Sequence, residues 1–156
     1  TLTSPIFIKR GPTMITQPEH TVEYRLGDGM WLKGYTLPQT QVVAGERLQL
    51  QLFWEVTQTL TRGDKTFIQL IDLNTTHKAA QRDGEPGCGV YHLGEWRPGD
   101  LNLDPYTLTV ASDTPPGTYT LLIGIVGDAG NLEITTPDGT SLGDAIGLDE
   151  VRITQP

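Results

Sequence analysis

Apolar and polar residues alternate along several segments of this chain. Apolar side chains at positions 48, 50, 52, 54 and 56 are separated mainly by polar ones. This period of two is typical of a half-buried β-strand. The same alternation recurs at 106–110, 119–125 and 151–154, and looser strand-length runs occupy 5–9, 21–26, 30–37, 66–73 and 77–82. The run at 66–73 has apolar side chains on both faces, which predicts a central strand covered on both sides.

Glycine and proline separate these runs. Turn sequences such as GDG (27–29), DGEPG (83–87), TPPG (114–117) and PDGT (137–140) favour tight turns, and no stretch of ten residues shows helical periodicity. The pattern predicts an all-β, immunoglobulin-like antiparallel β-sandwich of about nine strands. Tyr119 follows the TPPG turn directly, where we expect it to pack in the core or to form a hydrogen bond at a corner.

The length of 156 residues fits one domain. We expect residues 1–20 to be a partly ordered lead-in segment and residues 21–156 to form a single β-sandwich domain. The first residues, TLTSPIF, include neither an initiator methionine nor a basic, apolar leader. These features predict a soluble fragment of a longer chain.

Charge and hydropathy exclude two classes of partner. The formal charge of −8 disfavours contact with a phosphate backbone, so we expect no nucleic acid. Apolar runs such as LLIGIV (121–126) are far shorter than the ~20 residues that cross a bilayer, so we expect no membrane contact by this fragment itself.

The segment DGEPGCGVYHLGEWRPGD (83–100) invites a metal interpretation, because it holds the only cysteine and a histidine four positions later. Zinc needs three or four converging ligands, and Cys88 and His92 supply two. Acidic turns, such as the one at Asp138, offer oxygen ligands for calcium but match no twelve-residue calcium loop. We expect no metal and no cofactor, with calcium at an acidic turn left open.

Catalysis is not expected either. The three serines lie outside any G-x-S-x-G sequence, and no pair of carboxylates is singled out for glycoside hydrolysis.

Carbohydrate binding is the sharper alternative, because exposed aromatic rings can stack on a sugar while polar groups bind its hydroxyls. The candidate ligand-binding residues are Trp96, Tyr91, His92, Asp83, Arg97 and Asp100, and Trp31 and Tyr35 are further aromatic candidates. The competing and favoured interpretation packs Trp31, Tyr35 and Trp54 in the core and places Trp96 at the end of the sandwich. A binding module should expose at least two of Trp96, Tyr91, Trp31 and Tyr35 on one face.

Several motifs occur in a familiar order. VxxGExLxLxLFWEV (42–56) and TFIQLID (66–72) precede DGEPGxGxYxxxxWRPGD (83–100), and YTLTVxxDTPPGTYTLLIGIV (106–126) and PDGTxLGDAIxLDEVRI (137–153) follow. This order resembles a β-sandwich module at the C-terminal, extracytoplasmic end of polytopic membrane proteins of the glycosyltransferase (dolichyl-phosphate-mannose mannosyltransferase-like) type in filamentous green bacteria. The resemblance covers about residues 22–154. Cys88 departs from it, since a small residue or glycine is usual there.

The resemblance implies a non-catalytic domain, since the transferase chemistry of such proteins lies in their membrane-embedded part. We therefore expect an extracytoplasmic accessory or interaction domain, in the cell envelope or secreted, of a larger membrane-anchored protein. The alternative is a carbohydrate-binding module that recognises glycans through exposed aromatics. The expected partner is a glycan or the membrane-embedded part of the parent protein.

Overall fold

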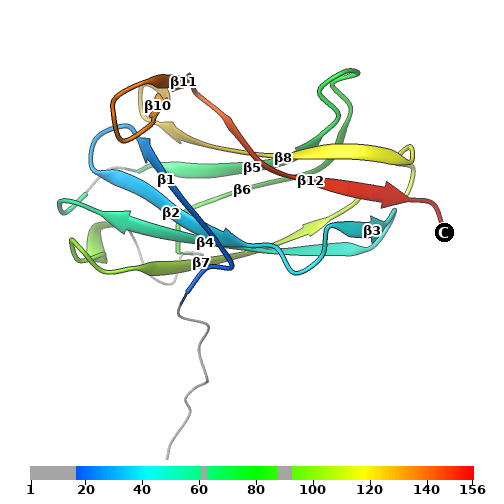
Figure 1. Ribbon diagram of the computed structural model, residues 1–156, viewed down its shortest axis with the longest axis horizontal. Coiled ribbons are helices and arrows are strands. Elements are labelled where there is room, and N and C mark those ends of the chain that lie inside the picture. The colour runs from blue at the N-terminus through cyan, green and yellow to red at the C-terminus, as the bar shows by residue number, and fades with distance from the viewer. Residues whose placement is uncertain (1–16, 61–62, 88–92) are drawn as a thin grey trace, which may run out of the picture.

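Two β-sheets form the molecule and stack face to face (Figure 1). The computed structural model describes residues 17–60, 63–87 and 93–156. In order across the first sheet lie β11 (Ser141–Gly143), β10 (Ile134–Thr135), β1 (His20–Leu26), β2 (Met30–Thr36), β4 (Arg47–Val56) and β7 (Asn102–Thr109). Across the second lie β3 (Gln41–Val43), β12 (Ile146–Thr154), β8 (Gly117–Gly127), β5 (Lys65–Ile71) and β6 (Lys78–Gly84), and β9 (Gly130–Asn131) pairs with β8.

The prediction of an all-β sandwich is confirmed. The described ranges hold twelve strands rather than about nine, because four strands of two or three residues are too short to show alternation in the sequence. One pair departs from the antiparallel pattern, since β3 runs parallel to β12. The helical content of the described residues is one 3₁₀ turn, η1 (Leu93–Glu95). No helix in these ranges is long and apolar enough to span a membrane. The expected strand at 5–9 lies outside the described residues.

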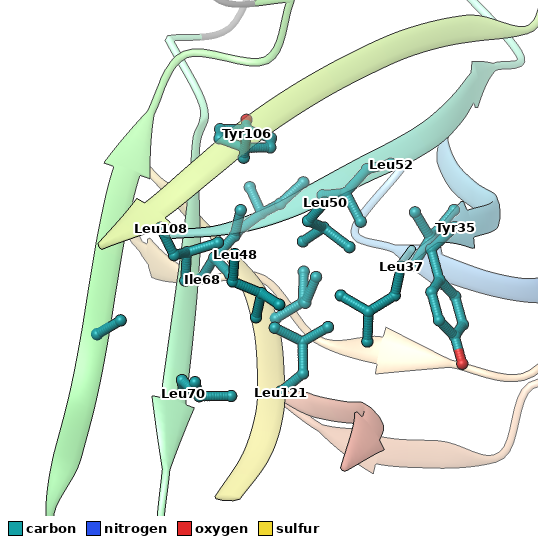
Figure 2. Close-up of a cluster of buried hydrophobic side chains, with 14 of the residues drawn as sticks. Tyr35, Leu37, Leu48, Leu50, Leu52, Ile68, Leu70, Tyr106, Leu108 and Leu121 are labelled. Atoms are coloured by element: carbon teal, nitrogen blue, oxygen red, sulfur yellow. The ribbon is translucent and has the colours of Figure 1, made fainter. Parts of the chain in front are cut away.

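The core lies between the sheets. The alternation in β4 is confirmed, because Leu48, Leu50, Leu52, Trp54 and Val56 are all buried in one apolar cluster. Figure 2 shows the first three of these leucines facing side chains of β5 and β8. Full burial of each such leucine contributes about 1.5–3 kcal/mol, so this interface is a main source of the stability of the fold.

Tyr119 forms the expected corner contact at the start of β8. Its side chain is buried, and its hydroxyl donates a hydrogen bond to the Pro115 carbonyl at 2.8 Å. The Thr114 hydroxyl donates to the Ala111 carbonyl at 2.6 Å. The turn is thereby fixed on both sides of the two prolines.

Strand β5 is internal to its sheet, between β8 and β6, but it is not covered on both faces. Ile68 and Leu70 are buried in the core. Phe67, Gln69 and Ile71 point to the opposite face and are half-buried. The prediction that both faces of this strand are covered is wrong, because the second face points away from the other sheet. It leaves an aromatic ring partly open to solvent.

Candidate functional site

A buried carboxylate anchors the start of the 83–100 segment. Asp104, in β7, has no exposed surface. One of its oxygens accepts a hydrogen bond from the Gly87 amide at 2.9 Å, and the other accepts one from the indole Nε1 of Trp54 at 3.0 Å. Asp104, which lies outside the 83–100 segment, therefore fastens Gly87 of that segment to β7, an edge strand of the first sheet.

Burial raises the pKa of the Asp104 carboxyl above its usual value. Hydrogen bonds from Tyr106, the Gly87 amide and the Trp54 indole act in the opposite direction and lower this pKa. A buried acid with a perturbed pKa can mark a catalytic group. Here both carboxylate oxygens are used to hold protein groups, which is a structural role.

Trp96 faces the core. Its side chain is 3% exposed and belongs to the apolar cluster between the sheets. Its amide donates to the Leu93 carbonyl at 3.2 Å, so the η1 turn directs the indole inward. The ring face of Trp96 is not available to a sugar, because other side chains already cover it. Tyr91 and His92 lie outside the described residues.

Arg97 and Asp100 are exposed in the turn that follows. The amide of Asp100 donates to the Arg97 carbonyl at 3.2 Å, and the Gly99 amide donates to the Val56 carbonyl at 3.0 Å. The turn therefore sits at the end of β4 in the first sheet. Asp83 lies elsewhere, on β6 in the second sheet. The described candidate residues of the 83–100 segment therefore do not come together at one site.

The other two aromatic candidates differ in exposure. Tyr35 is 6% exposed, and its hydroxyl lies 2.9 Å from the Leu148 carbonyl oxygen and 3.0 Å from a carboxylate oxygen of Asp149. Burial, with a contribution from Asp149, raises the pKa of Tyr35 to about 12. Trp31 is half-buried. Of the described candidates, Trp96 and Tyr35 are in the core, as a scaffold role requires.

A groove of about 390 Å³ lies on the outer face of the second sheet, over β5, β6, β8 and β9. Of these strands, β5, β6 and β8 lie together in one layer in Figure 1, and β9 pairs with β8. Of the candidate residues that the structure describes, Asp83 alone lines it. The lining consists of Lys65, Thr66, Phe67, Gln69, Gln81, Asp83, Val126 and Asn131.

Strand register brings these residues together. Phe67 pairs with Asp83 across β5 and β6, and Gln69 pairs with Gln81. On the other side, Phe67 pairs with Gly124 in β8. Directly paired side chains on one sheet face lie about 5 Å apart, so the aromatic ring has a carboxylate and two amides beside it.

The ring of Phe67 lies across β8 because residue 124 is glycine. A Cβ atom at Gly124 would be 2.2 Å from Cζ and 2.4 Å from Cε2 of Phe67, which no side chain can tolerate. The far edge of the ring therefore occupies the space that a side chain would fill. The ring is half-buried and lines the groove.

Hydrogen bonds orient the polar lining. The Gln81 amide nitrogen lies 3.2 and 3.3 Å from the two carboxylate oxygens of Asp83, and Lys78 Nζ donates to Gln81 Oε1 at 2.8 Å. The Asn131 amide donates to an Asp144 carboxylate oxygen at 3.3 Å. The groove thus combines an apolar platform with fixed amide and carboxylate groups, the composition typical of small-molecule sites.

Sequence reasoning missed most of this groove. Phe67 looked like a core residue, because apolar side chains occupy both faces of its run. Two signals were available: glutamines alternate with apolar residues on the same strands, and GIVG (124–127) places glycines inside a strand, which indicates close approach of another group. Only the structure shows that residues 67 and 124 are paired across β5 and β8.

The described residues contain no group of three or more histidine, cysteine, aspartate or glutamate side chains arranged to hold a metal ion. The acidic turn at Asp138 is engaged internally: its carboxylate accepts hydrogen bonds from the Thr136 and Thr140 hydroxyls and from the Thr140 amide. The contact with Thr136 is the largest cause that lowers the pKa of Asp138.

Comparison with known proteins assigns no family. No family model matches the chain, and no curated protein sequence is similar to it. Among solved structures, the C-terminal domain of wzt is 14% identical, with a TM-score of 0.49 over 90% of this chain and 83% of that one. The DNA glycosylase AlkC of Pseudomonas fluorescens is also 14% identical, with a TM-score of 0.46 over 81% of this chain and 31% of that one.

A Niemann-Pick type C2 protein from the Japanese carpenter ant is 7% identical, with a TM-score of 0.45 over 90% of this chain and 100% of that one. At such identities and TM-scores, none of the three carries a functional argument. The resemblance to the glycosyltransferase-associated module therefore stays a prediction.

Proposed function

We propose that this chain is a non-catalytic accessory domain of a longer, membrane-anchored protein, and that it acts outside the cytoplasm by binding a partner through the groove around Phe67. The observation that carries the proposal is the groove itself. It presents a half-buried aromatic ring with oriented polar groups on a rigid sheet face. Rigid strands hold such groups in place better than loops do.

Two further features support a binding role over a catalytic one. The most deeply buried carboxylate with a raised pKa, Asp104, has both oxygens engaged by Trp54 and Gly87. The groove lies on the outer face of the second sheet, whereas Asp104 belongs to the first sheet and is absent from the groove lining. The charge of −8 disfavours nucleic acid as the partner.

The cellular location can be tested separately from the binding surface. In cells that express the full-length parent, protease added outside should remove a tag placed after Pro156. Protection of the tag in intact cells, with cleavage only after lysis, would contradict the extracytoplasmic assignment.

Site-specific photo-crosslinking tests the binding surface. A benzophenone amino acid at Gln69, in the groove, should give an adduct with another macromolecule in such cells. The same amino acid at Gln49, on an exposed position of β4 in the opposite sheet, is the matched control. Equal yields at the two positions, or none at Gln69, would overturn the proposal.

A further inference from the structure

The polar groups of the groove determine which ligand chemistry fits it. We propose that the groove binds an uncharged oligosaccharide, with one sugar ring stacked on Phe67. This inference rests on the proposed binding role of the same groove and names its ligand class. It replaces the 83–100 segment, with Trp96 at its centre, as the expected sugar-contacting surface.

Stacking is the first step of the argument. The axial C–H groups of a pyranose form a flat apolar face that fits an aromatic ring lying parallel to a surface. The far edge of the Phe67 ring occupies the space over Gly124 on the neighbouring strand, so the ring extends along the sheet towards β8. Val126 extends the apolar floor of the groove beside it.

Hydroxyl recognition is the second step. A sugar hydroxyl both donates and accepts, so a groove that binds it needs both kinds of partner. Gln69, Gln81 and Asn131 each supply an amide with donor and acceptor atoms, and Asp83 supplies acceptors. Lys78 and Asp144, which bond to Gln81 and Asn131, fix the orientation of two of these amides.

Charge gives the third step. The lining carries one ammonium, Lys65, and one carboxylate, Asp83, and a second of each, Lys78 and Asp144, is bonded to the lining amides of Gln81 and Asn131. These four charges cancel, in a domain whose total charge is −8. An anionic ligand would be repelled and a strongly cationic one only weakly attracted, so a neutral polyhydroxylated ligand fits best.

NMR of the labelled domain gives a direct test. The side-chain amides of Gln69, Gln81 and Asn131 are separate signals inside the groove. Titration with neutral trisaccharides of mannose, glucose and N-acetylglucosamine should shift these signals in a saturable way for at least one sugar. A trisaccharide of galacturonic acid, which is anionic, should bind more weakly than its neutral counterparts.

Variants separate stacking from packing. Phe67→Leu keeps an apolar side chain over Gly124 but removes the flat ring, and it should weaken binding by about tenfold or more while the thermal midpoint stays close to wild type. Trp31→Ala is the matched control, since Trp31 is a half-buried aromatic that lines a shallow hollow on the other sheet. Its affinity should equal that of wild type.

Carboxylate variants separate the groove from the 83–100 segment. Asp83→Ala should weaken binding, whereas Asp100→Ala, an exposed carboxylate of the same segment outside the groove, should not. Equal effects of the two changes, or unchanged affinity of Phe67→Leu, would overturn the inference.

Absence of any shift with all the neutral sugars would also overturn it. If benzophenone at Gln69 still gave its adduct in cells, the binding role of the groove would stand and its partner would belong to another chemical class. If both experiments failed, the proposed function would fail with the inference.

Discussion

Replacement of Asp104 by alanine tests whether the 83–100 segment is held by the sandwich core. The change removes the acceptor of the hydrogen bonds from the Trp54 indole at 3.0 Å, from the Gly87 amide at 2.9 Å and from Tyr106. Trp54 is fully buried, so its N–H would have no access to water. Each buried donor left without a partner costs about 1–3 kcal/mol.

The loss of these hydrogen bonds together should lower the free energy of unfolding by about 3–5 kcal/mol. For a domain of this size the thermal midpoint should fall by roughly 10 °C. Urea denaturation followed by tryptophan fluorescence measures the first quantity, and calorimetry measures the second. Amide exchange at Gly87 should also accelerate, because its hydrogen bond to Asp104 is lost.

Asp100→Ala is the control, because Asp100 is an exposed carboxylate close in sequence. Its effect should stay within about 0.5 kcal/mol of wild type. If Asp104→Ala destabilised the protein no more than Asp100→Ala, the assignment of Asp104 as the anchor of this segment would be wrong.

The pH dependence of the Asp104→Asn variant gives an independent check. The raised pKa means that the folded protein binds this proton more tightly than the unfolded chain does. The contribution of Asp104 to stability is therefore complete below the ordinary carboxyl value and decreases as pH rises through the raised one. The stability of wild type relative to Asp104→Asn should fall over that range. A constant difference across it would contradict the raised pKa.

Three further experiments test individual contacts. Tyr119→Phe removes the hydrogen bond to Pro115 and should cost about 0.5–1.5 kcal/mol of unfolding free energy in urea; no change would refute its corner role. Gly124→Ala should lower the free energy of unfolding by about 1–3 kcal/mol, because the new Cβ clashes with the Phe67 ring. In a double-mutant cycle, Phe67→Ala should reduce this cost, and additive effects of the two changes would show that the ring does not lie over Gly124. Tyr35, with its pKa raised to about 12, should ionise well above the ordinary tyrosine value of about 10 in an ultraviolet titration, and stability should be lost as pH rises above about 10. Ionisation of every tyrosine near 10 would contradict its buried contact with Asp149.

The main strands could be read from the sequence because each has one buried face. In β4 the alternation at positions 48–56 follows directly from contact with the core, and in β8 the run after TPPG does the same. The short strands β9, β10 and β11 could not be predicted this way. They form through pairing with longer strands, and two or three residues hold no periodic pattern.

The candidate site was predicted less well, for a physical reason. Exposure of an aromatic side chain depends on which neighbours cover it, and strand register decides those neighbours. Trp96 was named as a candidate, yet the η1 turn directs it into the core. Phe67 was assigned to a covered strand, yet it is half-buried on the face that points away from the other sheet, and its ring reaches over Gly124.

By itself, the sequence determined the all-β class, the positions of the long strands, the corner role of Tyr119 and the acidic charge. These properties follow from local periodicity, turn chemistry and composition, which act over a few residues. The tertiary structure alone decided that Asp104 anchors the segment after Asp83, that Trp96 is buried, and that Phe67 lies beside Gln69, Gln81 and Asp83. Each of these facts depends on contacts between segments that are far apart in the sequence, and strand register decides which of their residues meet.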